Sequence, residues 1–353
     1  MSNKLKKVIK IIGRILLSFI LSICLLSVLY IVTNYYFTVR IPNPEKTTEE
    51  RAYSNQIITN MEEGFTYCKF DEKGFNNSYP AKKDKIDILL VGSSQMEGIH
   101  VPSDKNTGYL LNQKLPDYYT YNIGISGMYL PQNINYIGNA YQYFSPKKYI
   151  LIGTNNVCLN SSELESVYNN SYKTRKRLIT KGGYKKVVPP VLIYTFSKIK
   201  DKARLWRSKS KDYFDKNKKI NIKQADNQNI ISTQNKYFET LNKFLVFARK
   251  QVPESVSLVI FYYPSVNIDR EGKLLLNESE KNYVNGFEKA CQENNIIFVN
   301  MTQDFEKLYK EKHVLPFGFV NTRPGGGHLN IYGHQVISEK LSEVIHSKEE
   351  GKI

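Results

Sequence analysis

From residue 85 onward, short apolar runs alternate with longer amphipathic stretches, and this alternation limits the possible folds more than any other feature of the chain. The runs cover residues 86–92, 118–124, 149–153, 257–263 and 295–300. Helical candidates lie near residues 131–144, 233–250, 278–293, 304–310 and 330–345. Because the runs are apolar throughout and rich in β-branched residues, they are typical of parallel strands buried on both faces. The pattern therefore predicts an α/β domain of three layers, with helices on both faces of a parallel sheet.

A separate apolar stretch near the N-terminus predicts one transmembrane helix. Residues 15–32 carry no charged side chain, and residues 33–37 extend the stretch to the roughly 20 residues that a bilayer core requires. A cleaved signal peptide is the alternative, but its apolar core would be shorter and a small-residue cleavage site should follow it. Five basic residues and no acid precede the stretch: Lys4, Lys6, Lys7, Lys10 and Arg14. This bias predicts a single-pass protein of the cell membrane, with a cytoplasmic N-terminus and an extracytoplasmic domain.

The remaining boundaries follow from shifts in composition. Residues 38–84 are polar and aromatic with weak periodicity, which predicts a juxtamembrane stalk that packs onto the domain. The other expected parts are a basic tail over residues 1–14, the anchor over 15–37, the domain over 85–346 with a basic insertion at about 160–232, and a tail over 347–353.

The formal net charge is +17, and its distribution is more informative than its size. Residues 171–224 contain 18 Lys or Arg residues and three acids, so the basic excess outside the N-terminal tail lies in one segment. This argues against a diffusely basic nucleic-acid binder, and we expect no nucleic-acid partner. One interpretation of the segment is a patch that binds anionic lipid headgroups or an acidic polymer. The other is a solvated helical hairpin. The sequence leaves both open.

Cysteine and histidine usage argues against disulfides and metal sites. Four cysteines in 353 residues rule out a disulfide-stapled scaffold, and no Cys or His cluster has the spacing of zinc ligands. We therefore expect no metal and no cofactor. The exported cysteines, Cys68, Cys158 and Cys291, are expected as buried thiols, with one disulfide plus a free thiol as the alternative. His100, His313 and His346 have no convergent motif and are expected in surface or structural roles, and His334 is expected as a packed or capping residue.

Polar residues follow three of the predicted strands, at the edge of the sheet where α/β proteins place their chemistry. Ser94 follows the first run, Gly127 lies in the loop after the second, and Asn155 follows the third. His328 precedes the last helical stretch, on a turn of three glycines. Each signal alone is also typical of an ordinary turn. Their combination predicts a serine nucleophile with a histidine base and hydrogen-bond donors nearby.

These four segments, in this order, resemble the sequence blocks of the SGNH/GDSL hydrolase superfamily. The matching segments are residues 92–94, 122–127, 153–155 and 328–334, and the resemblance covers about residues 84–160 and 255–346. It implies a flavodoxin-like three-layer domain with Ser94 as nucleophile and His328 as general base. It also implies an oxyanion hole formed by Ser94, Gly127 and the side chain of Asn155.

One position departs from the family pattern. The family usually carries an aspartate three residues before the histidine, and Gly325 stands there in this chain. Such a carboxylate fixes the histidine tautomer and stabilises the imidazolium. A backbone carbonyl of the glycine turn is one possible replacement, and the side chains of Asn321 and Asp304 are candidates for another. The third alternative is a catalytically inactive domain that binds a glycan or acts as a scaffold.

The predicted anchor and the resemblance together suggest a function. Outward-facing SGNH proteins with a single span resemble the partners of membrane-bound O-acyltransferases. The resemblance implies O-acyl transfer, O-acetyl transfer in particular, to a cell-surface polysaccharide or related envelope polymer through an acyl-Ser94 intermediate. A carbohydrate esterase that deacetylates the same polymers is the alternative. The sequence does not identify the acyl group or the acceptor sugar.

Overall fold

A computed structural model describes residues 3–36, 57–60, 63–78, 85–169, 199–200, 227–269, 271–275 and 281–352. The chain divides into two compact units, one of residues 1–39 with 182–219 and one of residues 40–181 with 220–353. Nearly all of the predicted basic segment, residues 171–224, lies outside the described residues. Its two predicted roles therefore stay predictions.

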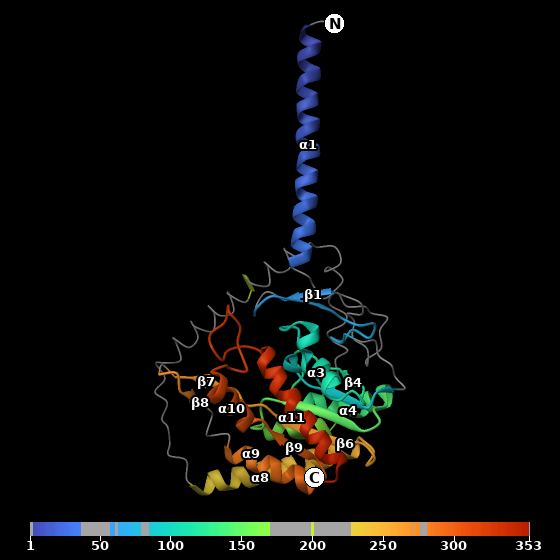
Figure 1. Ribbon diagram of the computed structural model, residues 1–353. Helices are drawn as coiled ribbons and strands as arrows, with labels where there is room; N and C mark the ends of the chain where they lie inside the picture. The colour runs from blue at the N-terminus through green and yellow to red at the C-terminus, as the bar shows by residue number, and fades with distance from the viewer. Residues whose placement is uncertain are drawn as a thin grey trace. The chain divides into compact units, whose positions relative to one another are not determined.

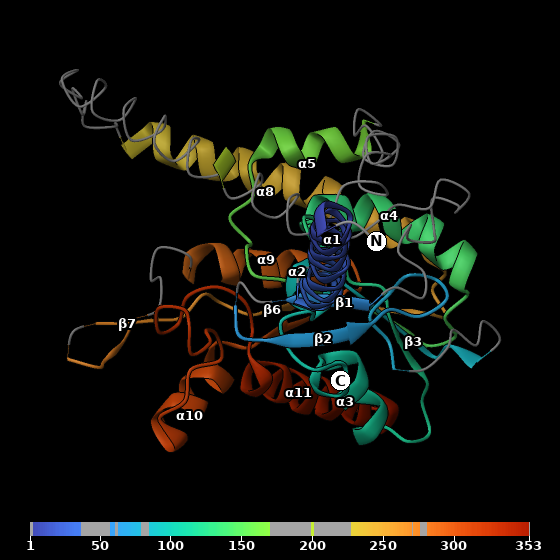
Figure 2. The ribbon, with the colours of Figure 1, turned by 90° about the horizontal axis from the view of Figure 1, so that it is seen from above.

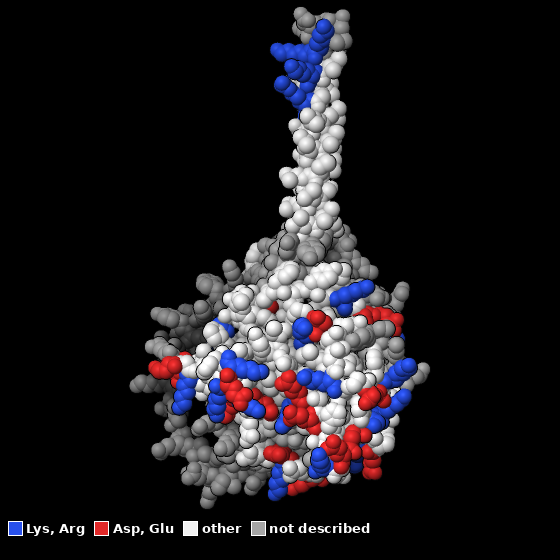
Figure 3. All heavy atoms as spheres, in the orientation of Figure 1, with Lys and Arg blue, Asp and Glu red and all other residues white. Residues whose placement is uncertain are grey.

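The described part of the first unit is dominated by helix α1 (Asn3–Tyr36). Within it, Lys6–Val32 has a mean hydropathy of 2.8 and is long and apolar enough to cross a membrane. These 27 residues rise about 40 Å as a helix, which exceeds the roughly 30 Å of a bilayer core. The hydroxyls of Ser22 and Ser27 each donate to a backbone carbonyl one turn earlier, at 2.8 Å, so neither needs water. Figure 3 shows basic side chains gathered at the N-terminal end of this helix.

The second unit is built on five parallel strands in the order β4-β3-β5-β6-β9. They are β3 (Ile88–Val91), β4 (Thr120–Asn122), β5 (Tyr149–Thr154), β6 (Ser257–Tyr262) and β9 (Ile297–Asn300). Four of them lie within their predicted runs, β5 extends one residue beyond its run to Thr154, and every residue of β3, β4 and β5 is buried. The strand order is flavodoxin-like, so the predicted α/β fold is confirmed. The order reverses at β3, and ligands of such sheets bind beyond the strand ends at that reversal.

Helices cover both faces of the sheet (Figure 2). One layer consists of α4 (Leu130–Phe144), α5 (Ser161–Tyr168), α8 (Asn227–Lys250) and α9 (Lys281–Glu293). The other consists of α3 (Thr107–Lys114), α10 (Thr302–Lys312) and α11 (Ile331–Glu349). Each layer of helices encloses a hydrophobic core against the sheet, and successive side chains of a strand point into opposite cores. In β5, Ile150 and Ile152 pack into the core under the first layer, and Tyr149 and Leu151 pack into the core under the second. Full burial of such side chains contributes about 1.5–3 kcal/mol each.

Residues from the predicted stalk form an antiparallel hairpin, β1 (Ile57–Asn60) and β2 (Thr66–Lys69), which Figure 1 shows next to the domain. Ile58, Cys68 and Phe70 make a small buried cluster with Ile99. Phe75, a few residues further on, belongs to the main core. This part of the segment is therefore an integral layer of the domain. The shorter elements are α2 (Ser94–Glu97), η2 (Ser103–Lys105), β7 (Asn267–Ile268) and β8 (Leu274–Leu275).

Candidate active site

Ser94 is the first residue of α2 and lies three residues after Val91, the last residue of β3. Ser93 caps the helix, with extended backbone angles and a side chain that accepts a hydrogen bond from Gln95 N at 3.4 Å. The chain therefore turns sharply from strand to helix at this point. Between residues 91 and 100, only Ser94 is not classed as buried. The turn thus presents a single serine hydroxyl at the edge of the sheet.

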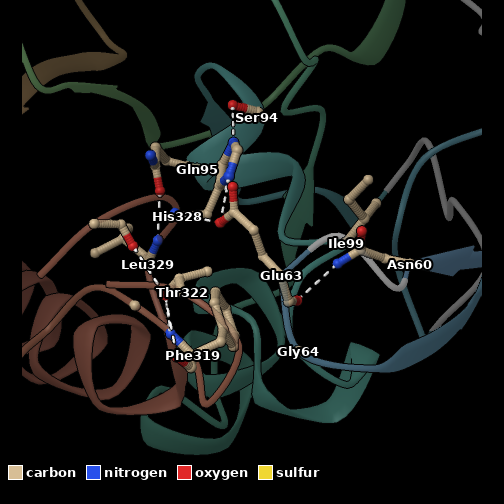
Figure 4. A network of polar contacts seen from close by, with 12 residues as sticks. Asn60, Glu63, Gly64, Ser94, Gln95, Ile99, Phe319, Thr322, His328 and Leu329 are labelled. Carbon is tan, nitrogen blue, oxygen red and sulfur yellow. Dashed lines mark hydrogen bonds and ion pairs between the residues drawn. The ribbon is translucent and has the colours of Figure 1, made fainter. Parts of the chain in front are cut away.

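His328, which is 234 residues away from Ser94 in sequence, contacts this hydroxyl. Its Nε2 lies 2.8 Å from Ser94 Oγ (Figure 4). The next residue, Leu329, donates its backbone N–H to Gln95 Oε1 at 2.7 Å, which ties the histidine segment to α2. Asn330 then caps α11 by accepting hydrogen bonds from the first-turn amides. The structure therefore brings the predicted nucleophile and the predicted base into direct contact.

Glu63 supplies a carboxylate to His328. Its Oε2 lies 2.9 Å from Nδ1 of the imidazole and accepts the backbone N–H of the same residue at 2.6 Å. A carboxylate at Nδ1 holds the proton on that nitrogen, so the Nε2 lone pair faces Ser94. The side chains of Glu63 and His328 are 20% and 25% exposed, so water only partly screens their interaction. Ser94, His328 and Glu63 thus form a nucleophile, a base and an orienting acid in line.

The two side chains predicted to orient His328 lie elsewhere. Asp304, on α10, is 3.9 Å from the Nζ of Lys340 on α11. The Oδ1 of Asn321 accepts the backbone N–H of Gly64, the neighbour of Glu63, at 2.6 Å. It therefore contacts the loop that carries Glu63. The prediction of Asp304 or Asn321 at Nδ1 is wrong, and no backbone carbonyl is needed there, because the Glu63 carboxylate occupies that position.

The glycine turn explains why the acid comes from a distant segment. Gly325 has a φ of +70°, and a Cβ at this position would lie 2.5 Å from the carbonyl oxygen of Val266. An aspartate at this family position would therefore overlap the backbone. Gly327 has a φ of +90°, and a Cβ there would lie 2.4 Å from the Glu63 carboxylate. The turn leaves room for a carboxylate that enters from outside.

His100 also belongs to the site, although its sequence context predicts only a surface or structural role. Its ring is buried and stacks on the ring of His328, with centroids 3.6 Å apart and planes 10° from parallel. This stacking limits rotation of the base. The ligand atoms of Glu63, His100 and His328 lie within 4.8 Å of one another. Imidazole lone pairs lie in the ring plane, so two stacked rings do not direct them at one ion. The cluster fits ring packing better than metal coordination.

The predicted oxyanion donors lie around the end of β3. Asn155 immediately follows β5, and β5 is the neighbour of β3, the strand that leads to Ser94. The loop with Gly127 crosses the end of β3, where Ile125 donates to the Gly92 carbonyl at 2.9 Å. Neither the Ser94 and Gly127 amides nor the Asn155 side chain has a hydrogen-bond partner among the residues that the structure describes. These three donors are open to a ligand.

The oxyanion loop is fixed by the helix that carries the nucleophile. Glu97, three residues after Ser94, is almost fully buried and accepts hydrogen bonds from the amide and hydroxyl of Ser126. Met128 donates to the carbonyl of Ile125 at 3.1 Å and closes a turn in which Gly127 has a φ of +80°. The amide of Gly127 is thereby held at a fixed distance from α2.

The remaining histidine of the last block and the cysteines have structural roles. His334 is fully buried with Nδ1 2.8 Å from Thr107 Oγ1, and burial lowers its pKa to about 3. It is therefore neutral and packed, as the helical pattern predicts. None of the four cysteines forms a disulfide. Cys68 and Cys291 are buried, as predicted, and burial raises the pKa of both thiols, whereas Cys158 is only partly buried.

The arrangement can perform nucleophilic acyl transfer. A serine hydroxyl, an imidazole held by a carboxylate and three open donors at one sheet edge are the parts that this chemistry needs. Replacing Asn155 tests the donors, because one preorganised donor contributes about 10²–10³ in rate.

Asn155→Ala is therefore expected to lower kcat for an activated acetyl ester by about 10²–10³ without shifting the unfolding midpoint. The exposed Asn169, at the end of α5, gives the matched control Asn169→Ala, which should leave kcat unchanged. A loss of less than about threefold for Asn155→Ala would exclude its side chain from the reaction.

No protein-family model and no curated protein matches the chain. Solved structures do resemble it. An acetyl xylan esterase shares 13% identity and a TM-score of 0.40, with 74% of this chain and 100% of that one covered. A G-D-S-L family lipolytic protein from Veillonella parvula shares 13% identity and a TM-score of 0.37, with 73% of this chain and 97% of that one covered. A lipase/acylhydrolase from Enterococcus faecalis shares 10% identity and a TM-score of 0.38, with 74% of this chain and 96% of that one covered.

Proposed function

We propose that this chain is a membrane-anchored serine acyltransferase that O-acetylates a cell-surface polysaccharide or related envelope polymer. The observation that carries the proposal is the contact series from Ser94 Oγ to His328 Nε2, and from His328 Nδ1 to Glu63. This series supplies the nucleophile and the base, and it holds the imidazole in the tautomer that the base role requires.

In the first half of the reaction, Ser94 Oγ attacks the carbonyl carbon of the acetyl donor and gives its proton to His328 Nε2. Glu63 stabilises the imidazolium, and the donors of Ser94, Gly127 and Asn155 stabilise the oxyanion. The C–O bond to the leaving group then breaks, and His328 returns the proton to that group. The product is acetyl-Ser94.

In the second half, a hydroxyl of the acceptor gives its proton to His328 and attacks the acetyl carbon. The bond to Ser94 breaks, and Ser94 Oγ recovers the proton from His328. The acetyl group then resides on the acceptor oxygen. The second step therefore decides between transfer to sugar and hydrolysis, because water can take the place of the sugar hydroxyl.

The helix α1 supports a location at the membrane. It is long enough to span a bilayer, and Lys6, Lys7, Lys10 and Arg14 at one end favour a cytoplasmic N-terminus. A freely diffusing esterase needs no such anchor. An enzyme that receives acetyl groups at the membrane does, and the partner that we propose is a membrane-bound O-acyltransferase.

A carbohydrate esterase on the same polymers is the second candidate. It is favoured by the partial exposure of His328, whose side chain is 25% accessible, because water can then reach the acyl-enzyme. The inactive-scaffold alternative loses its main support. That alternative depended on a missing acid at Gly325, and Glu63 provides a carboxylate at the same histidine nitrogen.

The proposal is tested with the full-length chain in detergent, incubated with p-nitrophenyl acetate and digested for mass spectrometry. We expect an acetyl group on the peptide that contains Ser94. A carbohydrate acceptor is then added, and the acetyl ester formed on sugar is compared with the acetate released. Ester on sugar supports the transferase, acetate alone supports the esterase, and absence of any adduct or turnover contradicts both.

A further inference from the structure

A cleft of about 220 Å³ opens between the first turn of α4 and residues 154–163. Two of the lining residues come shortly after the predicted oxyanion donors in sequence. Tyr129 is two residues after Gly127, and Asn156 is the residue after Asn155. The cleft therefore lies next to the loops that carry the Gly127 and Asn155 donors. Its volume is below the range of about 300–1,000 Å³ that holds drug-sized molecules, and it suits a single small ring.

An exposed aromatic ring forms one wall. Tyr129 is 60% exposed, although it lies at the start of a buried helix. Such a ring has an apolar face and a polar tip, and it binds ligands that present C–H groups next to hydroxyls. A pyranose ring has these two kinds of surface.

The opposite wall carries an amide and a carboxylate. The Oδ1 of Asn156 accepts the amide of Cys158 at 2.8 Å, and its Nδ2 donates to no other described residue. Thr154 Oγ1 bonds to the backbone of Asn156 and fixes this loop. The carboxylate of Glu163, in the first turn of α5, makes no hydrogen bond or ion pair with another described residue. An amide donor beside a carboxylate acceptor matches a pair of neighbouring hydroxyls.

The charge of the cleft restricts its ligand further. Among the described residues that line the cleft, Glu163 carries the only ionisable acid or base apart from the Tyr129 phenol. A carboxylate here repels phosphate or carboxylate groups of an anionic polymer. The cleft therefore favours an uncharged ligand.

We propose that this cleft is the subsite for one neutral sugar residue of the polymer on which Ser94 acts. This inference rests on the proposed function and adds the place and the charge class of the sugar. The same subsite serves both directions of the chemistry: it holds the acceptor sugar during transfer and the acetylated sugar during deacetylation. Its contribution appears in the KM for the saccharide in either case.

Binding to the full-length Ser94→Ala chain tests the subsite without turnover. Calorimetric titrations with tetramers of N-acetylglucosamine and of xylose should show saturable binding, and tetragalacturonate should bind less tightly. Adding Tyr129→Ala or Glu163→Gln should weaken binding of the neutral tetramer at least about fivefold, since each removes about 1 kcal/mol or more. Tyr129→Phe, which keeps the ring, should retain most of the affinity.

The matched control is Glu165→Gln, two positions further along α5 and outside the cleft, which should leave the affinity unchanged. Failure of both neutral tetramers to bind, equal binding by the Tyr129→Ala chain, or tighter binding of tetragalacturonate overturns the subsite. These outcomes are separate from the proposed function. Absence of acetyl-Ser94 contradicts the acyl chemistry, whereas binding to the Ser94→Ala chain decides the subsite by itself.

Discussion

Ser94→Ala is expected to abolish covalent labelling by a serine-reactive phosphonate and to lower kcat for an activated acetyl ester by about 10⁶, the scale seen when a serine enzyme loses its nucleophile. The expected loss is this large because no other described hydroxyl lies in hydrogen-bond contact with His328 Nε2. Labelling is followed by mass spectrometry of the intact chain, and kcat by release of the leaving group.

The neighbouring serine provides the matched control. Ser93 is buried and caps α2, so Ser93→Ala should cost about 1 kcal/mol of stability while leaving a labelled enzyme. Undiminished labelling of the Ser94→Ala chain would remove Ser94 as the nucleophile. Loss of labelling in both variants, with a normal unfolding midpoint for each, would show that the probe reports on the α2 turn and not on one hydroxyl.

The parts of the site that belong to the sheet could be predicted from the sequence. Strands that are apolar throughout form only one common kind of sheet, and their carboxyl ends meet at one edge. The positions of Ser94 and Asn155 relative to each other follow from this geometry, because β3 and β5 are neighbours. His328 could be predicted from its place before the last helix and from its resemblance to a known block.

Glu63 could not be predicted in the same way. It is 265 residues from His328 in sequence, and it lies in a segment of weak periodicity, between two strands of four residues each. Nothing local indicates that this hairpin packs against the glycine turn. One signal was present, however. Three consecutive glycines at residues 325–327 precede the histidine, and the Glu63 carboxylate occupies the space that a side chain at Gly327 would need.

His100 was missed for a related reason. Its ring is placed by Ile99, whose carbonyl accepts the Thr66 hydroxyl of β2 and whose side chain packs in the hairpin cluster. The stacked histidine pair therefore depends on a tertiary contact between the hairpin and the loop after α2. Both features that the sequence did not indicate, the acid and the stacked ring, depend on the same hairpin.

Because the site depends on the hairpin, replacing Glu63 is the second prediction with a large expected effect on kcat. Glu63→Gln keeps the shape of the side chain but removes its charge, so the imidazolium loses its counterion and the amide can donate to Nδ1 and select the wrong tautomer. In serine proteases the equivalent change lowers kcat about 10⁴-fold. We expect a loss of that order in kcat with little change in KM, measured on an activated acetyl ester.

Two further variants distinguish Glu63 from the other acids considered. Adding Gly325→Asp to the Glu63→Gln chain should not restore activity, because a Cβ at residue 325 overlaps the Val266 carbonyl. Asp304→Asn should leave kcat unchanged, since this carboxylate faces Lys340 at 3.9 Å. A rescue by Gly325→Asp, or a loss for Asp304→Asn as large as that for Glu63→Gln, would transfer the orienting role away from the hairpin. If neither occurs, catalysis depends on a carboxylate that precedes the parallel sheet in the chain and reaches the site only when the hairpin is packed against the domain.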